Sequence, residues 1–245
     1  MKNLVKQYSF KERILVICYI LAQLSLACLI LFLKVGYTFV ITTMIFVSLN
    51  FIVSTIFGYK YKLLLFISLG LLFTIVSDVF IIILQDYLLG LIFFNIAQLS
   101  YMMYLILHNT NAAYRISNVV VRIGLIILGE ILTAILLNDI YDALIGLAVV
   151  YAINLICNCI FSSTYFKKSL LLFFGFLLFI FCDIFVGFNF LSTLDAFNKN
   201  EMVQTLSYTA INLPWVFYIP SQLLITSYVI TFIPRRNILL ESQTK

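Results

Sequence analysis

Charged side chains are scarce in this chain of 245 residues, where Asp, Glu, Lys and Arg together make up 10% of the positions. A soluble domain carries about 25% charged and about 45–50% apolar residues, whereas this chain is 64% hydrophobic and its mean hydropathy is +1.13. The scarcity of charge excludes a soluble globular enzyme, and the hydrophobicity excludes a disordered chain. No short unit repeats along the sequence, which excludes a solenoid. The composition is that of an integral membrane protein.

The chain also lacks the short motifs of nucleotide, zinc-protease and serine-hydrolase chemistry, namely a Walker loop, HExxH and GxSxG. Its single histidine, His108, lies at the end of a predicted span, where we expect an interfacial role. The five cysteines are odd in number and fall within predicted spans, so no disulfide framework is expected. Cys157 and Cys159 are two positions apart and face different directions on a helix, so they predict no metal site. We expect no cofactor.

Eight apolar runs are long enough to cross a bilayer, which takes about 20 helical residues. They are Ile14 to Leu33, Tyr37 to Phe57, Leu63 to Leu84, Tyr87 to Leu107, Val119 to Leu137, Ile140 to Phe161, Ser169 to Phe190 and roughly Ser207 to Phe232. The connections between them are too short to fold on their own. We therefore predict an all-α polytopic membrane protein with one domain, residues 1–245.

Basic residues lie mostly on one side of the predicted spans. If the N-terminus is cytoplasmic, this side holds Lys2, Lys6, Lys11, Arg13, Lys60, Lys62, Arg115, Lys167, Lys168, Arg235, Arg236 and Lys245. Lys34 and Lys199 fall on the other side, and Arg122 lies inside the fifth run near the basic side. This pattern predicts that both termini are cytoplasmic. It also explains the net charge of +5 without a nucleic-acid partner.

The third and seventh runs resemble each other. In both, a glycine lies eight residues before an aspartate and a phenylalanine two residues after it: Gly70, Asp78 and Phe80, and Gly175, Asp183 and Phe185. The pattern favours a parallel duplication of four-helix halves, approximately 1–108 and 109–245. The alternative is a chance likeness between two runs rich in Leu and Phe.

Three acids lie within the predicted spans: Asp78, Asp183 and Glu130. A carboxylate inside a bilayer costs a few kcal/mol, so we expect each to face the bundle interior or a water-filled cavity. The alternative is a structural role as hydrogen-bonded contacts between helices. Polar residues on other spans recur at helical spacing and predict a polar pocket around these acids. The pocket residues that we predict are Asn95, Gln98, Tyr101, Glu130, Asn154, Trp215, Tyr218 and Gln222. Pro214 and Pro220 predict a kink in the last span.

An ordered set of short motifs runs through most of the chain. It comprises Ser77-Asp78, then Gly90, Phe94, Ala97, Gln98 and Tyr101, then Cys182-Asp183, and then Trp215, Tyr218, Gln222, Leu224 and Ile225. The set resembles the YhhN-like lysoplasmalogenase family, whose motifs are (G/S)D, GxxxFxxAHxxY, SD and WxxYxxxQxLI. The resemblance implies an eight-span hydrolase that cleaves the vinyl ether of lysoplasmalogens to a fatty aldehyde and a glycerophospho-alcohol.

The sequence departs from this pattern where Gln98 replaces the expected histidine, Cys182 replaces a serine and Ser77 replaces a frequent glycine. Gln98 can form hydrogen bonds but cannot titrate. Two carboxyls suit the implied reaction, because hydrolysis of a vinyl ether needs one proton donor and one carboxylate that stabilises the cation and orients water. We predict Asp78 and Asp183 as the catalytic pair, with the two roles assignable either way.

Two other functions fit the same buried acids. One is a proton- or cation-coupled transporter of small solutes. The other is a lipid-binding membrane protein without catalytic activity. The abundance of Ile, Phe, Lys, Asn and Tyr is typical of an AT-rich bacterial genome, so we expect the protein in a bacterial cytoplasmic membrane, with a lysophospholipid or another lipid as its substrate.

Overall fold

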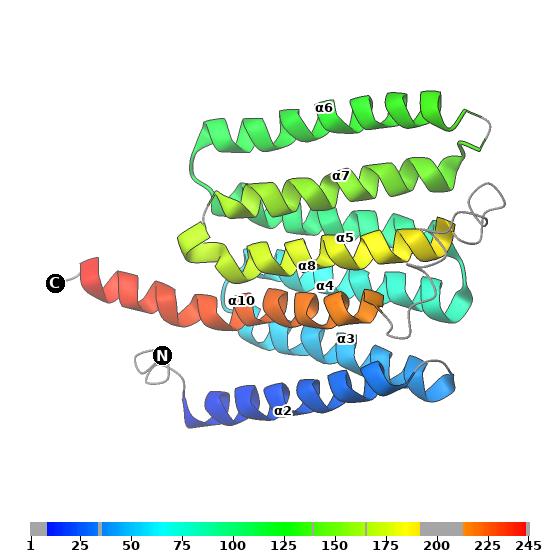
Figure 1. Cartoon of the computed structure of the whole chain (residues 1–245). Coiled ribbons are helices and arrows are strands. Elements are labelled where there is room, and N and C mark those ends of the chain that lie inside the picture. Colours follow the sequence, from blue (N-terminus) through cyan, green and yellow to red (C-terminus); the bar gives the residue numbers. More distant parts are fainter. Residues whose placement is uncertain (1–8, 34–35, 139, 165, 192–212, 244–245) are drawn as a thin grey trace.

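The computed structural model describes residues 9–33, 36–138, 140–164, 166–191 and 213–243. Within these ranges, eight helices are long and apolar enough to cross a membrane (Figure 1). The prediction of an all-α bundle with eight spanning helices is therefore confirmed. The helices are α2 (Phe10–Phe32), α3 (Tyr37–Gly58), α4 (Leu65–Asp78) with the π-helix η1 (Val79–Leu84), α5 (Tyr87–His108), α6 (Ala112–Leu136), α7 (Ala143–Ser163), α8 (Phe166–Leu191) and α10 (Leu213–Gln243).

Polar residues in the short turns begin several of these helices. Ser9 forms a capping box with Glu12 at α2, Asp86 accepts a hydrogen bond from the Leu89 amide at α5, and Asp142 accepts one from the Ile145 amide at α7. Such caps pair the amide groups that the first helical turn leaves without partners. The ends of the spanning segments are thus fixed by side chains as well as by hydropathy.

The fifth spanning helix begins earlier than its hydropathy predicts. It begins at Ala112 and not at Val119, because the Asn111 side chain accepts a hydrogen bond from the Ala113 amide at 2.9 Å and caps the helix there. The turns gained carry polar residues, including Asn118. At the last span, the predicted start from Ser207 to Asn212 lies outside the described residues.

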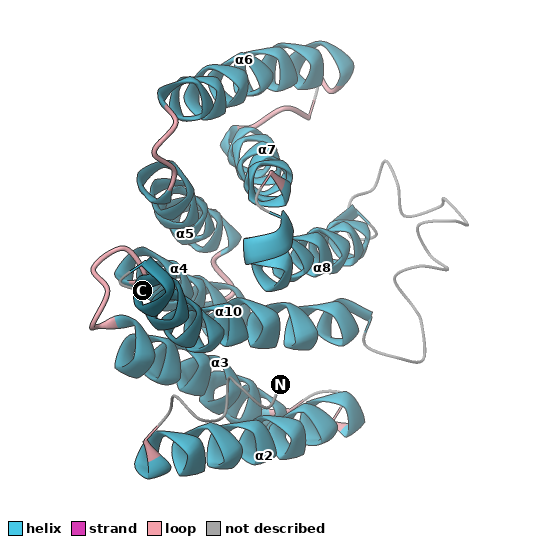
Figure 2. Cartoon of the chain, turned by 90° about the vertical axis from the view of Figure 1, so that its left-hand side faces the viewer, coloured by secondary structure: helices cyan, strands magenta, loops and turns pink. Residues whose placement is uncertain are grey.

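The helices lie side by side, with α2 and α6 at opposite edges of the bundle (Figures 1 and 2). α10 packs against α8 and α3, α4 packs against α5, and α7 lies against α5 and α8. α2 packs mainly on α3, and α6 mainly on α7. The centre of the bundle is therefore formed by α4, α5, α7, α8 and α10.

Buried polar side chains join helices away from the bundle centre. Asn50 of α3 accepts hydrogen bonds from the hydroxyls of Tyr19 on α2, at 2.7 Å, and Thr226 on α10, at 3.0 Å. Gln23 of α2 donates to the Phe46 carbonyl on α3 at 3.1 Å. Hydrogen bonds of this kind, together with close packing, hold transmembrane helices together where water exerts no hydrophobic force between them.

The two repeated glycines lie where helices approach closely. A Cβ atom at Gly70 would lie 2.4 Å from Cε1 of Tyr101 on α5, and one at Gly175 would lie 2.8 Å from Cγ1 of Ile225 on α10. Each glycine thus makes room for a side chain from the next spanning helix that the structure describes. The duplication itself stays a prediction.

Two helical irregularities of the described residues lie away from the prolines of the last span, where a kink stays a prediction. α10 runs through Pro220 as one unbroken helix, and Pro214 lies in its first turn, where the missing amide hydrogen costs no helical hydrogen bond. The non-helical residue is Ser169 in α8 (φ −122°, ψ 24°), whose hydroxyl donates to the Ser162 carbonyl at 2.6 Å. A second irregularity is η1, which directly follows Asp78.

Candidate active site

Two aspartates from α4 and α8 lie together at the bundle centre. Asp78 is 6% exposed and accepts a hydrogen bond from the Tyr218 hydroxyl on α10. Asp183, which is partly buried, accepts one from the Tyr151 hydroxyl on α7 at 2.5 Å. The rings of Phe94 and Phe179 connect the two tyrosines, which places both carboxyls in one region of the bundle. Residues from four helices therefore assemble one pair of carboxyls, each held by a tyrosine.

Aromatic rings surround this pair. The Phe94 ring on α5 lies 5.4 Å from the Tyr151 ring and 6.0 Å from the Phe179 ring on α8. Phe179 in turn lies 5.7 Å from the ring of Tyr218. The three contacts form a continuous aromatic wall from one tyrosine to the other, and such a wall keeps bulk water from the carboxyls and strengthens electrostatic interactions between them.

The helix that carries Asp78 changes its winding directly after this residue. η1 packs against the start of α5, where a Cβ at Gly90 would lie 2.4 Å from Cγ1 of Ile81. The Ser77 hydroxyl donates to the Gly90 carbonyl at 2.6 Å. η1 ends this spanning helix at Leu84, and the two contacts hold it against α5 directly after a buried carboxyl.

Three predicted pocket residues adjoin the tyrosines or the aromatic wall. Trp215 packs edge-on against Tyr218, with ring centroids 5.1 Å apart. Tyr101 is 1% exposed and lies edge-on against Phe176 at 5.2 Å. Gln222 follows Tyr218 by one helical turn and is 1% exposed, and its Nε2 has no hydrogen-bond partner among the described residues.

Asn95 connects two helices. Its Nδ2 donates to the Leu91 carbonyl on its own helix at 3.0 Å and to the Leu147 carbonyl on α7 at 3.1 Å. The contact fixes α5 against α7 close to Phe94.

Arg122 forms a buried polar network that the sequence analysis did not foresee. It is 3% exposed at the middle of α6, and its Nη1 donates to the carbonyl and to Oδ1 of Asn154, at 2.9 and 2.7 Å. Its Nη2 donates to Oδ1 of Asn118 at 3.1 Å and of Asn158 at 2.9 Å. Asn158 Nδ2 then donates to both the carbonyl and Oε1 of Gln98, each at 2.9 Å. The predicted pocket residues Asn154 and Gln98 thus belong to one network.

Glu130 lies apart from the aspartates. It is on α6, at the edge of the bundle, and its carboxylate accepts a hydrogen bond from the hydroxyl of Tyr141 in the turn before α7. This hydrogen bond to Glu130 raises the pKa of Tyr141. α6 packs mainly on α7, so the structure does not bring Glu130 into the group formed by Asp78 and Asp183.

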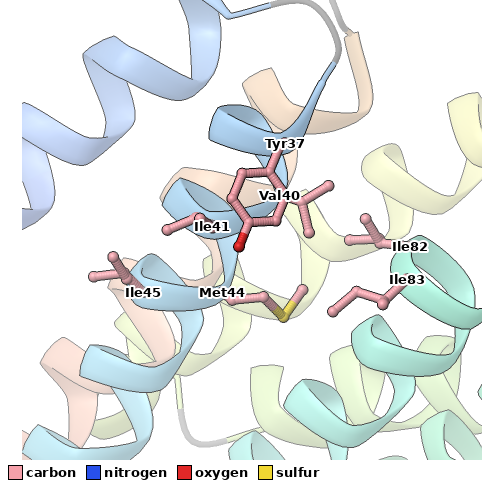
Figure 3. Close-up of a pocket in the computed structure, with 7 residues that line it drawn as sticks. All are labelled: Tyr37, Val40, Ile41, Met44, Ile45, Ile82 and Ile83. Atoms are coloured by element: carbon pink, nitrogen blue, oxygen red, sulfur yellow. The ribbon is translucent and has the colours of Figure 1, made fainter.

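An apolar groove lies between α3 and η1 (Figure 3). Its volume is about 460 Å³, and its lining residues are Tyr37, Val40, Ile41, Met44, Ile45, Ile82 and Ile83. Ile82 follows Asp78 by four residues, and Phe39, next to Val40, contacts the Trp215 ring at 5.4 Å. Neither aspartate and neither of their tyrosines lines the groove, which reaches the helix of Asp78 through the residues of η1.

The histidine and the cysteine nearest the carboxyl pair have other surroundings. Within the described residues, no group of three His, Cys, Asp or Glu side chains could hold a metal ion. His108 stacks on Tyr104 with centroids 5.3 Å apart at the end of α5. Cys182 is a buried free thiol next to Asp183.

Comparison with known proteins identifies the family. No curated protein and no solved structure matches the chain. The model of the YhhN family matches residues 37–229, a range that runs from the start of α3 into α10 and includes both aspartates and both of their tyrosines. Since the match covers most of the chain, the protein belongs to the YhhN family.

Proposed function

We propose that the protein is a membrane-embedded hydrolase that cleaves the vinyl ether bond of lysoplasmalogens. The observation that carries the proposal is the carboxyl pair Asp78 and Asp183, assembled inside the membrane, held by two tyrosines and walled by aromatic rings. Charged groups inside a membrane are expensive and are generally functional. Membership of the YhhN family supports the same reading.

The reaction needs a proton at carbon and a negative charge beside the developing cation. One carboxylic acid protonates the alkene carbon remote from the ether oxygen, which leaves an oxocarbenium ion. The other, ionised, stabilises that cation and takes a proton from the attacking water. The hemiacetal then breaks its bond to the glycerol oxygen, which leaves as an alcohol, and the fatty aldehyde is released. Two carboxyls whose surroundings favour different protonation states can divide these tasks.

Two buried carboxyls that share one negative charge suit this division. The reaction requires one protonated and one ionised carboxyl, and repulsion between two carboxylates in a medium of low dielectric constant favours that combination. Tyr218 and Tyr151 each donate a hydroxyl to one carboxyl, which fixes its orientation. Either aspartate can serve as the acid in this scheme.

The hydrocarbon chain of the substrate would lie in the apolar groove between α3 and η1. The volume of about 460 Å³ falls within the range of about 300–1,000 Å³ that is typical of ligand pockets. Ile41, Ile45 and Ile83 on its walls are also exposed at the surface of the bundle. A chain from the bilayer would therefore enter sideways and would lie along η1, which directly follows Asp78 in the chain.

The experiment is an assay of fatty aldehyde release from a lysoplasmalogen by the purified protein. We expect Asp78→Asn and Asp183→Asn each to abolish turnover while the protein stays folded. The matched control is Asp142→Asn, because asparagine caps a helix about as well as aspartate and Asp142 caps α7 away from the pair. Full activity in either site variant would remove that residue from the mechanism.

A further inference from the structure

Arg122 orients the side-chain amides around it because it can only donate hydrogen bonds. A guanidinium group only donates hydrogen bonds, so each group that it contacts must present an oxygen. Its described acceptors are all neutral amide oxygens, from Asn118, Asn154 and Asn158. Arg122 therefore acts as a fixed donor at one end of the polar network.

The side-chain amide of Asn158, oriented by Arg122, in turn determines the orientation of the Gln98 amide. Because Asn158 Oδ1 faces Arg122, its Nδ2 faces α5, where it donates to the carbonyl of Gln98. A carbonyl only accepts, so this second contact fixes the same orientation of the Asn158 amide. The other hydrogen of Nδ2 is donated to Oε1 of Gln98. Gln98 must consequently turn its Nε2 away from Asn158.

Nε2 of Gln98 is the last donor in this series of hydrogen bonds. Gln98 is 0% exposed, and no acceptor for its Nε2 is found in the described part of the chain. A buried donor without an acceptor is costly, and buried polar groups are nearly always paired. This unpartnered donor is therefore available to a ligand that accepts a hydrogen bond.

Gln98 shares a helix face with Phe94 of the aromatic wall and with Tyr101. Phe94 precedes it by four residues and contacts Tyr151, and Tyr101 follows it by three and contacts Phe176. Residues three and four apart lie on one face of an α-helix. Gln98 thus lies one helical turn from Phe94, whose ring contacts the tyrosine that holds Asp183.

We propose that Gln98 is a substrate-binding residue that donates from Nε2 to the hydroxyl oxygen on the middle glycerol carbon of a lysophospholipid, and that Arg122 and Asn158 are positioning residues. This rests on the proposed function for the class of substrate. The ether oxygen is unsuited as the acceptor, because a hydrogen bond to it would withdraw the electron pair that stabilises the oxocarbenium ion. A phosphate is unsuited as well, because one neutral amide does not compensate for its desolvation.

The test measures binding apart from turnover. Trp215 is the only tryptophan of the chain and contacts Tyr218, so its fluorescence reports on occupancy near the carboxyl pair. The probes are three saturated hexadecyl ether lysophosphocholines, which have no vinyl ether to cleave. Their middle glycerol carbon bears a hydroxyl, a methoxy group or only hydrogen.

A fixed donor predicts one pattern for the wild-type protein. The hydroxyl and methoxy lipids, which both accept a hydrogen bond, should bind with similar affinity. The deoxy lipid should bind about tenfold more weakly, as expected for one lost hydrogen bond to a buried donor. A deoxy lipid that binds equally well, or a methoxy lipid that binds as weakly as the deoxy one, overturns the proposal.

Three variants test this series of hydrogen bonds. Gln98→Met should bind all three lipids alike, whereas Gln98→His should keep the wild-type pattern, because imidazole can accept from Asn158 and donate from its other nitrogen. Asn158→Asp presents only acceptors, so Gln98 should reverse its amide and expose Oε1. The hydroxyl lipid, which can also donate, should still bind, and the methoxy lipid should fall to the deoxy level. A wild-type pattern in Gln98→Met or Asn158→Asp overturns the proposal.

The matched control is Gln23→Met. Gln23 is also a glutamine with 0% exposure, but it bonds α2 to α3, so its loss should lower stability without changing the ratio of the three affinities. Aldehyde release from a lysoplasmalogen is measured in parallel. If no aldehyde appears but the affinity pattern holds, the proposed function fails alone; if aldehyde appears without the pattern, the role of Gln98 fails alone.

Discussion

Gly70 offers a quantitative test of the packing that positions Tyr101. A methyl group at Gly70 would lie 2.4 Å from Cε1 and 2.6 Å from Cζ of Tyr101. The Tyr101 ring is 1% exposed and lies against Phe176 on its other side, so it has little room to move away. Gly70→Ala should therefore destabilise the protein by the cost of overpacking, about 1–3 kcal/mol, reduced by the gain of about 1 kcal/mol that alanine brings to a helix interior.

Gly124 supplies the matched control. It lies within α6, and a Cβ at this position would meet nothing within 4 Å. Gly124→Ala should gain helix stability without a clash, so the difference between the two variants isolates the overpacking term of about 1–3 kcal/mol. The assay is reversible unfolding in mixed micelles, together with aldehyde release. A Gly70→Ala variant as stable and as active as Gly124→Ala would refute the close approach of Tyr101.

The groove predicts chain-length selectivity. Met44→Trp should fill the groove and lower kcat/KM for long-chain lysoplasmalogens by about fourfold for each methylene displaced. Ile52→Trp, on the exposed surface of the same helix, should leave the chain-length profile unchanged. Equal profiles in the two variants would contradict the assignment. Asn50→Leu should cost about 1–3 kcal/mol of stability, because two buried hydroxyls lose their acceptor, with kcat retained in the folded fraction. Glu130→Gln should lower kcat far less than the loss of either site aspartate, because Glu130 contacts Tyr141 at the bundle edge; complete loss of activity would place it in the mechanism.

Hydropathy predicts the spanning helices because bilayer thickness sets their length. The ends of six of the eight predicted ranges differ little from those of the helices, and the start of the last range lies outside the described residues. Hydropathy fails at the start of α6, where a capping residue and a polar helical turn extend the helix beyond its apolar part. It also cannot show which way a charged residue faces. Arg122, interpreted as a charge near the basic side, lies buried at mid-helix against α7.

The sequence identifies the aspartates as candidate site residues because a carboxyl inside an apolar run costs free energy whichever way it faces. Their partners are not visible in the same way. Tyr151 lies 32 residues from Asp183, and Tyr218 lies 140 residues from Asp78, so the pairing depends on how helices distant in the chain pack together. Helical spacing places Tyr151 and Asn154 on one face of α7. Only the packing of α8 and α6 against α7 shows that Tyr151 contacts Asp183 and that Asn154 contacts Arg122.

The most direct test of the account is aldehyde release by the purified wild-type protein from a lysoplasmalogen, beside the saturated ether lysolipid of equal chain length. The account predicts fatty aldehyde from the vinyl ether alone, and none from either lipid with Asp78→Asn. A folded wild-type protein that binds the lysolipid and releases no aldehyde would contradict the assignment of the carboxyl pair to vinyl ether hydrolysis.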